Sequence, residues 1–473
     1  MSTAPPGTAR TSTAPAGAEP LTRRRRWTIL AVCALSMFLV GLDTTIVNVA
    51  LPSIGAGLHA DTRALEWVVD AYTLVLASLL ISSGATADRS GRRRVFRIGL
   101  AVFGLASLAC AAAPTVGALV AARAAQGVGA SMLSPVALAV VVNAMPDPRE
   151  RARAIGVWAS VFGLSMATGP AVGGMLIDAL GWRAVFWVNA PLVLLALVLA
   201  GRVLPESRAA VARALDLPGQ VLMTVLVAAS VAALIEGPHL GWTAPVLLVA
   251  YAVAAFALIT FVAVERRRRE PMIDLVLFRR RTFLAAFLAA FAVFVGLSGT
   301  LLLNTLYLQH ARGWTPLHAG LATLPMAVGA TVCAPLAGNL AGRIGARVPL
   351  LVAGTCYLAG GLVLTRLTDG TGLATLLTSY LLIGIGFGFA NAPVTTIAVG
   401  GLPPARAGVA GAITSTARQL GAAAGIALAG GLLAGATTPA GLAAATHPGW
   451  LVVAGCGVVL LAAASTARRP GAA

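Results

Sequence analysis

Long apolar segments separated by short polar ones follow one another along nearly the whole chain. A helix needs about 20 apolar residues, at about 1.5 Å rise per residue, to cross about 30 Å of hydrocarbon. Fourteen segments meet this criterion, so the pattern predicts an all-α integral membrane protein with fourteen transmembrane helices. They lie near residues 28–52, 65–86, 95–113, 115–141, 152–178, 183–203, 217–236, 243–264, 283–309, 317–341, 348–366, 372–397, 408–434 and 447–466.

The positions of the basic residues test this assignment independently, because cytoplasmic loops of membrane proteins are enriched in Lys and Arg. All 34 basic residues are arginine, and most lie in segments that are cytoplasmic if both termini are inside. The predicted outer loops hold only Arg63, Arg183, Arg312 and Arg366. A missed or additional helix would invert the alternation after it, and no inversion occurs. We therefore predict that the N- and C-termini are both cytoplasmic.

Composition excludes several other classes of protein. The chain is 58% hydrophobic and 11% charged, whereas soluble domains carry about 25% charged residues. The net charge of +18 follows from the arginine-rich cytoplasmic loops and does not indicate a nucleic-acid partner. The five cysteines are scattered singly, without the spacing of a metal site. We predict no metal and no cofactor.

A faint internal repeat indicates two related halves. The segments 84–94 and 338–347 both end an apolar helix with glycines and arginines. Related halves that flank a central site are common in secondary transporters. The predicted organisation is a cytoplasmic tail (1–26), a six-helix bundle (27–203), two inserted helices with linkers (204–281), a second six-helix bundle (282–467) and a short tail (468–473).

Three of the ionisable residues inside the predicted helices form a candidate site. Such residues cost roughly 2.5–3.5 kcal/mol each on insertion scales and usually have a function. Asp43 and Asp70, in the first and second helices, come to similar depth in the outer half, and Arg123 in the fourth helix is within reach of both. A carboxylate beside an arginine, in a cavity that opens to alternate sides, predicts a proton-coupling site. The alternative is a fixed salt bridge that only joins helices.

Other polar residues inside the helices predict a substrate cavity. Gln126 shares a helix face with Arg123 at i+3, whereas Glu66 lies closer to water and is interpreted as lining the mouth or as structural. The predicted cavity residues are Asp43, Asn48, Asp70, Gln126, Asn304 and Asn391.

Two glycine-containing motifs predict conformational gating. In the fifth helix, Pro170 removes a backbone hydrogen bond while Gly169 and Gly173 form a small-residue packing face; spacing alone leaves a hinge and simple packing equally open. At the inner end of the second helix, Asp88 is expected to accept hydrogen bonds that form in one conformation and break in another. The predicted gating residues are Gly84, Asp88, Arg89, Gly91, Arg92, Gly169, Pro170, Gly173 and Gly174.

Together these motifs resemble the fourteen-helix drug:proton antiporters of the major facilitator superfamily. Leu42–Pro52 is similar to that branch's first-helix motif, and Gly84–Arg94 matches the loop motif between helices 2 and 3, with Thr86 where leucine is more usual. Arg123–Gly129 matches the motif associated with proton transfer, and Gly169–Gly174 the antiporter motif. The resemblance covers the whole chain after the tail.

This resemblance implies a proton-driven exporter that works by alternating access in a bacterial plasma membrane, with small molecules, protons and the bilayer as partners and no obligate protein partner. Asp70 resembles a residue of quaternary-ammonium exporters, whereas segments 233–242 and 307–313 resemble exporters of the methylenomycin type, so substrate charge stays open. Alternatives are an uptake symporter and a flippase for a lipid or envelope precursor. An intramembrane enzyme is not favoured, because the sequence has no metal cluster, nucleophile–His pair or paired catalytic motif. ATP-driven transport by this chain is excluded, because the phosphate-binding Walker motif needs a lysine and the chain has none.

Overall fold

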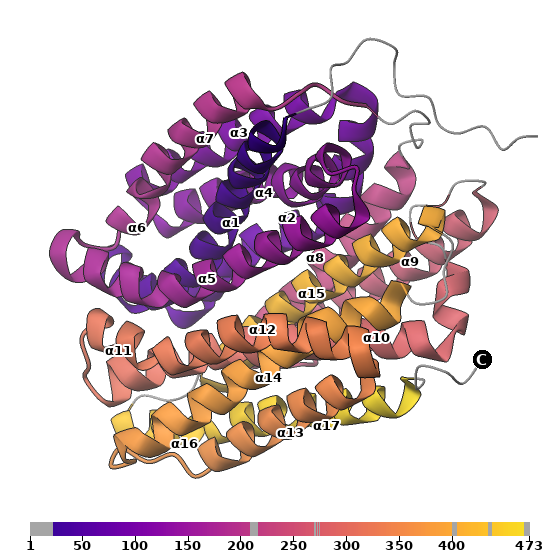
Figure 1. Ribbon diagram of the computed structural model, residues 1–473. Coiled ribbons are helices and arrows are strands. Elements are labelled where there is room, and N and C mark those ends of the chain that lie inside the picture. The colour runs from indigo at the N-terminus through magenta and orange to yellow at the C-terminus, as the bar shows by residue number, and fades with distance from the viewer. Residues whose placement is uncertain are drawn as a thin grey trace, which may run out of the picture.

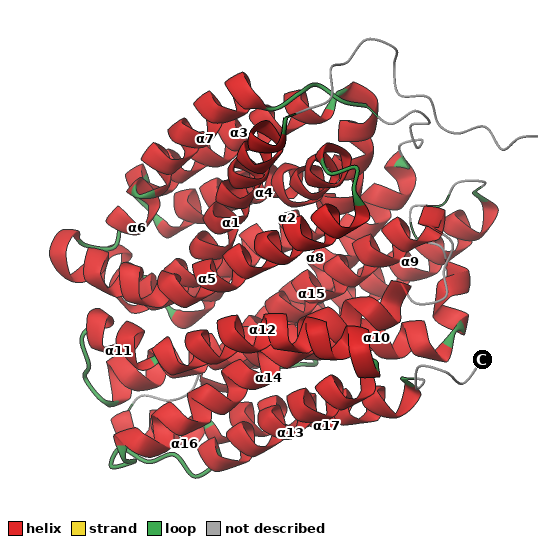
Figure 2. Cartoon of the chain, in the orientation of Figure 1, coloured by secondary structure: helices red, strands yellow, loops and turns green. Residues whose placement is uncertain are grey.

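The computed structural model describes residues 22–208, 216–268, 271, 273, 275–399, 404–433 and 438–467, and within these ranges it is helical without strands (Figure 2). The helices up to the middle of the chain are α1 (Arg23–Leu58), α2 (Thr62–Ser90), α3 (Arg92–Ala112), α4 (Val116–Ala144), α5 (Pro148–Leu180), α6 (Ala184–Trp187), α7 (Asn189–Val203), α8 (Leu217–Leu240) and α9 (Pro245–Arg267).

The remaining helices begin with a short 3-10 turn, η1 (Leu275–Arg279). They continue with α10 (Arg281–Leu306), the π-helical η2 (Tyr307–Ala311), α11 (Pro316–Ala322), α12 (Leu324–Ile344), α13 (Arg347–Leu364), α14 (Leu373–Val399), α15 (Pro404–Leu433), α16 (Pro439–Ala445) and α17 (His447–Thr466).

Each of the fourteen predicted segments is occupied by one helix or by two consecutive helices. Within the described residues, twelve helices are long and apolar enough to cross a membrane. The other two predicted segments hold α5 and α15, which are 33 and 30 residues long. The first helix begins earlier than predicted, at Arg23, because the Thr22 hydroxyl accepts a hydrogen bond from the Arg25 amide and caps it. Residues 1–21 of the predicted N-terminal tail and the whole predicted C-terminal tail, 468–473, lie outside the described residues.

Several predicted segments are divided into a short and a long helix, which hydropathy alone does not show. The breaks separate α6 from α7, α11 from α12 and α16 from α17. Pro325 and Pro448 stand in the first turn of α12 and α17. A proline has no backbone N–H to donate to the preceding turn, so a helix restarts there readily.

The contacts among helices repeat from one half of the chain to the other (Figure 1). α1 packs against α5 as α10 packs against α15, α2 against α4 as α12 against α14, and α3 against α7 as α13 against α17. The repeated motif behaves alike in both halves: α2 ends at Gly91 with φ 109° and α12 at Gly345 with φ 87°. Only glycine adopts such backbone angles without strain.

Two seams join the halves. In one, α2 packs against α15; in the other, α5 packs against α11 and α12. The hairpin of α8 and α9 covers the first seam, because α8 contacts both α2 and α15 while α9 packs on α8 (Figure 1). We call the end of the bundle where α1 begins the inner end and the opposite end, with α6, α11 and α16, the outer end.

Candidate transport site

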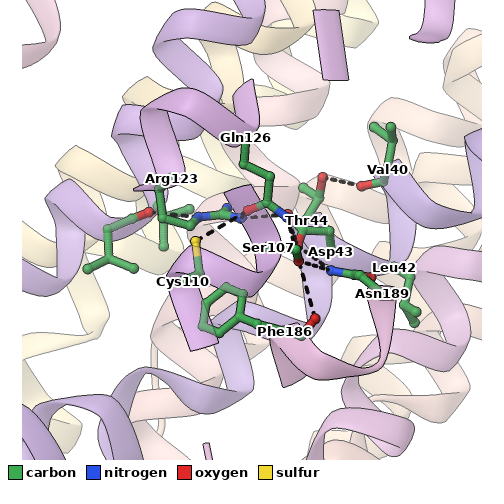
Figure 3. Close-up of polar contacts among 12 residues, drawn as sticks. Val40, Leu42, Asp43, Thr44, Ser107, Cys110, Arg123, Gln126, Phe186 and Asn189 are labelled. Atoms are coloured by element: carbon green, nitrogen blue, oxygen red, sulfur yellow. Dashed lines mark hydrogen bonds and ion pairs between the residues drawn. The ribbon is translucent and has the colours of Figure 1, made fainter. Parts of the chain in front are cut away.

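A completely buried carboxylate, Asp43 on α1, is the centre of a polar network inside the first bundle (Figure 3). Its Oδ2 accepts a hydrogen bond of 2.6 Å from Nη1 of Arg123 on α4. Its Oδ1 accepts from the amide groups of Gln126, at 2.7 Å, and Asn189, at 3.1 Å. Both oxygens of Asp43 are therefore occupied by donors, and its charge is neutralised by the guanidinium.

Arg123 is also completely buried and contacts four different kinds of partner. Besides Asp43, its Nη1 donates to Oε1 of Gln126 at 2.7 Å, and its Nε donates to the carbonyl of Val68 at 3.1 Å. The guanidinium carbon lies 4.3 Å from the ring centroid of Tyr72. Buried ion pairs hold only when such additional contacts compensate for the lost hydration, so this arrangement fixes the pair in place.

A shell of neutral groups surrounds the pair. The Ser107 hydroxyl accepts hydrogen bonds from Asn189 at 2.9 Å and from Gln126 at 3.3 Å, and donates to the carbonyl of Phe186 at 3.2 Å (Figure 3). The network therefore connects helices α1, α3, α4 and α7. Asn189 and Ser107 are absent from the predicted site; the signal that points to Asn189 is an amide side chain within an otherwise apolar segment.

The expectation that Arg123 reaches both aspartates is wrong for Asp70. The Asp70 carboxylate is completely buried, and its Oδ1 accepts a hydrogen bond of 3.2 Å from Thr73. Its Oδ2 has no hydrogen-bond partner among the described residues. The helical period explains the difference: α2 presents Val68 and Tyr72 to Arg123, and Asp70, two residues from each, points about 200° away around the helix.

Glu66 also differs from its predicted place at a wet mouth. Its relative exposure is 2%, and neither carboxylate oxygen has a hydrogen-bond partner in the part of the chain that the structure describes. It lies against Gly430 of α15, where any Cβ would collide with the carboxylate. The neighbouring Glu236 of α8 is paired instead, with Arg63 at 2.6 Å.

The remaining predicted cavity residues make contacts within the protein. Asn48 donates to the carbonyl of Thr44 on its own helix at 2.8 Å, and Asn391 likewise to Phe387 at 3.2 Å. The Asn304 side chain accepts from the Tyr380 hydroxyl. In this conformation Asn48 and Asn304 are buried, so their contact with a substrate stays a prediction.

The predicted gating residues of α5 lie where the helix touches both halves. On one face, Gly169 and Gly173 approach Thr45 and Ile46 of α1 in the same bundle. On the other, Gly174 lies so close to α11 that an added Cβ would be 2.5 Å from the Pro316 carbonyl oxygen. The Pro170 carbonyl is approached equally closely by Gly320 of α11. α5 stays helical through Pro170.

The motif at the inner end of α2 makes its contacts with the start of the next helix, and the breaking of these contacts in another conformation stays a prediction. Asp88 accepts hydrogen bonds from Arg92 of α3, at 2.8 and 3.1 Å. Gly91 forms the turn, Arg89 is exposed, and Gly84 has ordinary contact with Pro135 of α4. The Arg93 amide donates to Glu206, in the segment that follows α7. The Asp88 carboxylate is thus occupied by the arginine that begins the next helix in the sequence.

Further hydrogen bonds join the halves at the outer end. Gln309 of η2 donates to the carbonyl of Val49 on α1 at 3.0 Å, and the Leu317 amide donates to Asp178 at 3.3 Å. Gly430 covers Glu66, and Gly174 lies against α11. Together with the hydrogen bonds, these contacts close the outer end. A helical bundle with two repeated halves, a buried charge network and a closed seam at one end defines a multi-pass membrane transporter.

Comparison with known proteins specifies the family. Residues 33–426 match the Major Facilitator Superfamily, and the chain belongs to this family. It is 42% identical over 414 residues, 88% of this chain and 77% of the relative, to the multidrug resistance protein Stp of Mycobacterium tuberculosis. It is 37% identical over 439 residues, 92% of this chain and 90% of the relative, to the methylenomycin A resistance protein of Streptomyces coelicolor.

Solved structures show the same fold at low sequence identity. The crystal structure of a D-xylose-proton symporter superposes with a TM-score of 0.66 at 17% identity, covering 93% of this chain and 97% of the symporter. A bacterial homologue of the lysosomal transporter Spinster, described as inward-facing and unoccupied, superposes with a TM-score of 0.62 at 18% identity, covering 94% and 96%. Both likenesses concern the fold alone.

Proposed function

We propose that this protein is a proton-driven exporter of hydrophobic or cationic small molecules, including antibiotics, in a bacterial plasma membrane. The observation that carries the proposal is a fixed Asp43–Arg123 pair together with a separate, buried and partly unpartnered Asp70 on the neighbouring helix α2, in a transporter whose relatives are named for drug resistance. The exporter has fourteen transmembrane helices with cytoplasmic termini, uses the proton gradient as its energy source and needs no cofactor.

The two bundles, 27–203 and 282–467, alternate access to a site between them, with the hairpin in 204–281 beside the α2–α15 seam. The closed contacts at the outer end support assignment of this conformation to the state that exchanges with the cytoplasm. The reverse state requires α5 to separate from α11 and α2 from α15. Because Gly174 and Gly320 permit backbone contact between α5 and α11, these residues act as the outer gate.

Of the predicted proton-coupling residues Asp43, Asp70 and Arg123, the contacts favour Asp70 as the proton carrier. Both oxygens of Asp43 accept hydrogen bonds. Of the described donors to them, Arg123 is charged and the other two are neutral amides. Protonation of Asp43 would leave the buried guanidinium without a counter-ion, which is costly. Asp70 has an unpartnered oxygen and no counter-ion among the described residues. Asp70 is therefore the carboxylate that binds and releases the proton. Asp43 and Arg123 fix the relative positions of α1 and α4 in the first bundle.

The test uses proteoliposomes that contain a pH-sensitive dye and have an acidic interior. Lipophilic cations, with ethidium first, and neutral antibiotics are added one at a time. Proton:drug antiport predicts alkalinisation of the interior that depends on a substrate, persists in Asp369→Asn (an exposed outer-loop carboxylate) and is absent in Asp43→Asn/Asp70→Asn. Without a response to any compound from folded protein, the exporter proposal fails and lipid flipping is the next assay. A proton flux in the same direction as the substrate would identify a symporter.

A further inference from the structure

The Glu66 carboxylate is buried between α2 and α15 at the outer end, and no cation among the described residues pairs with it. Its relative exposure is 2%, and neither oxygen accepts a hydrogen bond from the described residues. Gly430 of α15 lies directly against it. Because Gly430 belongs to the seam between α2 and α15, a movement that opened this seam would expose Glu66 to water.

Asp70 lies one helical turn further inward on the same face of α2, since residues at i and i+4 are neighbours about 5–6 Å apart. Its Oδ2 is also buried without a partner. Of the four carboxylate oxygens on this face, only Asp70 Oδ1 accepts a hydrogen bond, from Thr73.

The surrounding charged groups are engaged elsewhere. On α2 itself Asp61 accepts from the Ala64 amide, and Arg63 pairs with Glu236 of α8. On α4, Arg123 pairs with Asp43 of α1, and on α15 Arg418 donates to Thr395. His59, at the end of α1, is exposed. The described cations near this face therefore leave Glu66 and Asp70 without a counter-ion.

Two neighbouring carboxylates in an apolar seam cannot both stay ionised. Burial disfavours each charge, and like charges disfavour one another. A seam closed over both groups is stable only if both are neutral, and a proton on each achieves this. Removal of either proton places an uncompensated charge against α15 and favours opening.

We propose that Glu66 and Asp70 form a two-proton site on α2, and that the outer end closes only after both carboxylates have been protonated. The inference rests on the proposed antiport and adds its stoichiometry, two protons for each substrate molecule. Glu66 and Asp70 take one proton each from outside water in the open state. After closure, Asp70 releases its proton inward, the Glu66 proton passes to the vacated Asp70 carboxylate, and Asp70 releases it in turn.

The stoichiometry has an electrical consequence. Exchange of two protons for one monovalent cation moves one net positive charge with the protons. At equal pH on both sides, an interior-positive membrane potential then drives protons out and ethidium into the vesicle. Passive ethidium flux goes in the opposite direction, since the potential repels a cation from the interior. The sign of the flux therefore separates the two processes, whatever the orientation of the protein in the vesicle.

The experiment measures ethidium uptake into proteoliposomes at zero pH difference with a valinomycin–potassium potential. The wild type is expected to accumulate ethidium against the potential. Glu66→Gln, which removes one proton site without changing side-chain size, is expected to keep exchange driven by a pH gradient and to lose the response to the potential. Glu66→Asp and the exposed control Asp369→Asn are expected to respond as the wild type does.

Two outcomes overturn the two-proton site: a wild type that exchanges ethidium for protons without response to the potential, and a Glu66→Gln variant that responds fully. If Glu66→Gln does not fold, protons released into weakly buffered detergent solution when ethidium binds to wild type decide the question; two per ethidium support the site and one contradicts it. Absence of any proton exchange by the wild type, with ethidium or the other compounds, is a failure of the proposed function itself.

Discussion

The first bundle places carboxylates in two contrasting environments on neighbouring helices. Asp43 has a guanidinium and two amides around it, all within hydrogen-bond distance. Glu66 and Asp70 lie on the α2 face that meets α15. Among the described residues, Asp70 accepts one hydrogen bond, from the Thr73 hydroxyl, and Glu66 accepts none. Equal burial thus accompanies opposite surroundings: a fully coordinated carboxylate fixes the helices, whereas we propose that the unpartnered carboxylates at the seam between α2 and α15 exchange protons.

The largest expected effect comes from breaking the paired centre. Arg123→Leu leaves Asp43 charged and buried without its counter-ion, which costs about 3–5 kcal/mol. The purified variant should unfold at markedly lower temperature than the wild type in detergent. Asp43→Asn/Arg123→Leu removes both charges and should recover much of that loss. Equal melting temperatures for the single and double variants would contradict the account of the pair.

The neutral shell should contribute less than the ion pair. Asn189→Ala removes the hydrogen bonds to Asp43 and Ser107, and hydrogen bonds to charged groups are worth about 1.5–3 kcal/mol. The thermal unfolding temperature should fall by an intermediate amount, and Asn189→Asp, which places a second carboxylate beside Asp43, should be worse than alanine. Wild-type stability of both variants would remove Asn189 from the network.

The seam between α5 and α11, which contains Gly174, can be compared with the seam between α2 and α15, which contains Glu66. Gly174→Ala places a Cβ against the Pro316 carbonyl, and overpacking costs about 1–3 kcal/mol. The closed state should lose population by about tenfold to a hundredfold. Labelling of a Leu317→Cys background by an impermeant maleimide should therefore accelerate. Gly455→Ala, at a helical glycine with open space around it, is the matched control and should leave labelling unchanged.

The smallest effect is expected at the partly exposed ion pair. Arg63 is 44% exposed and Glu236 15% exposed, so the cation can stay hydrated, and loss of the carboxylate should cost less than breaking the fully buried Asp43–Arg123 pair. Glu236→Gln should change the unfolding temperature little. A loss comparable to that of Arg123→Leu would show that exposure does not separate structural from marginal charges in this protein.

Much of the helical framework follows from hydropathy and arginine placement. Segment 115–141 is occupied by α4 and segment 372–397 by α14, with ends that differ by a few residues. These features depend on local composition, which the sequence contains directly. The breaks between α11 and α12 and between α16 and α17 escape hydropathy, since both sides of each break are apolar.

The site was less predictable because it depends on how each helix is rotated. Asp43 and Arg123 were expected to meet, and they do. Asp70 was expected beside them, but the α2 surface presented to α4 carries Val68 and Tyr72 instead. Glu66 was expected near water because of its place close to a helix end, and only the partner helix α15, distant in sequence, covers it. Such contacts require the packed bundle.

The most direct test of the central claim compares Asp70→Asn with Asp43→Asn in both transport and stability. If the unpartnered carboxylate carries protons, Asp70→Asn should lose substrate-dependent alkalinisation, down to the level of empty vesicles, while its stability stays within about 1 kcal/mol of wild type, the value of one hydrogen bond. Asp43→Asn should lower the unfolding temperature, because Arg123 loses its counter-ion. Wild-type antiport by Asp70→Asn, or its unfolding in place of Asp43→Asn, would contradict the account.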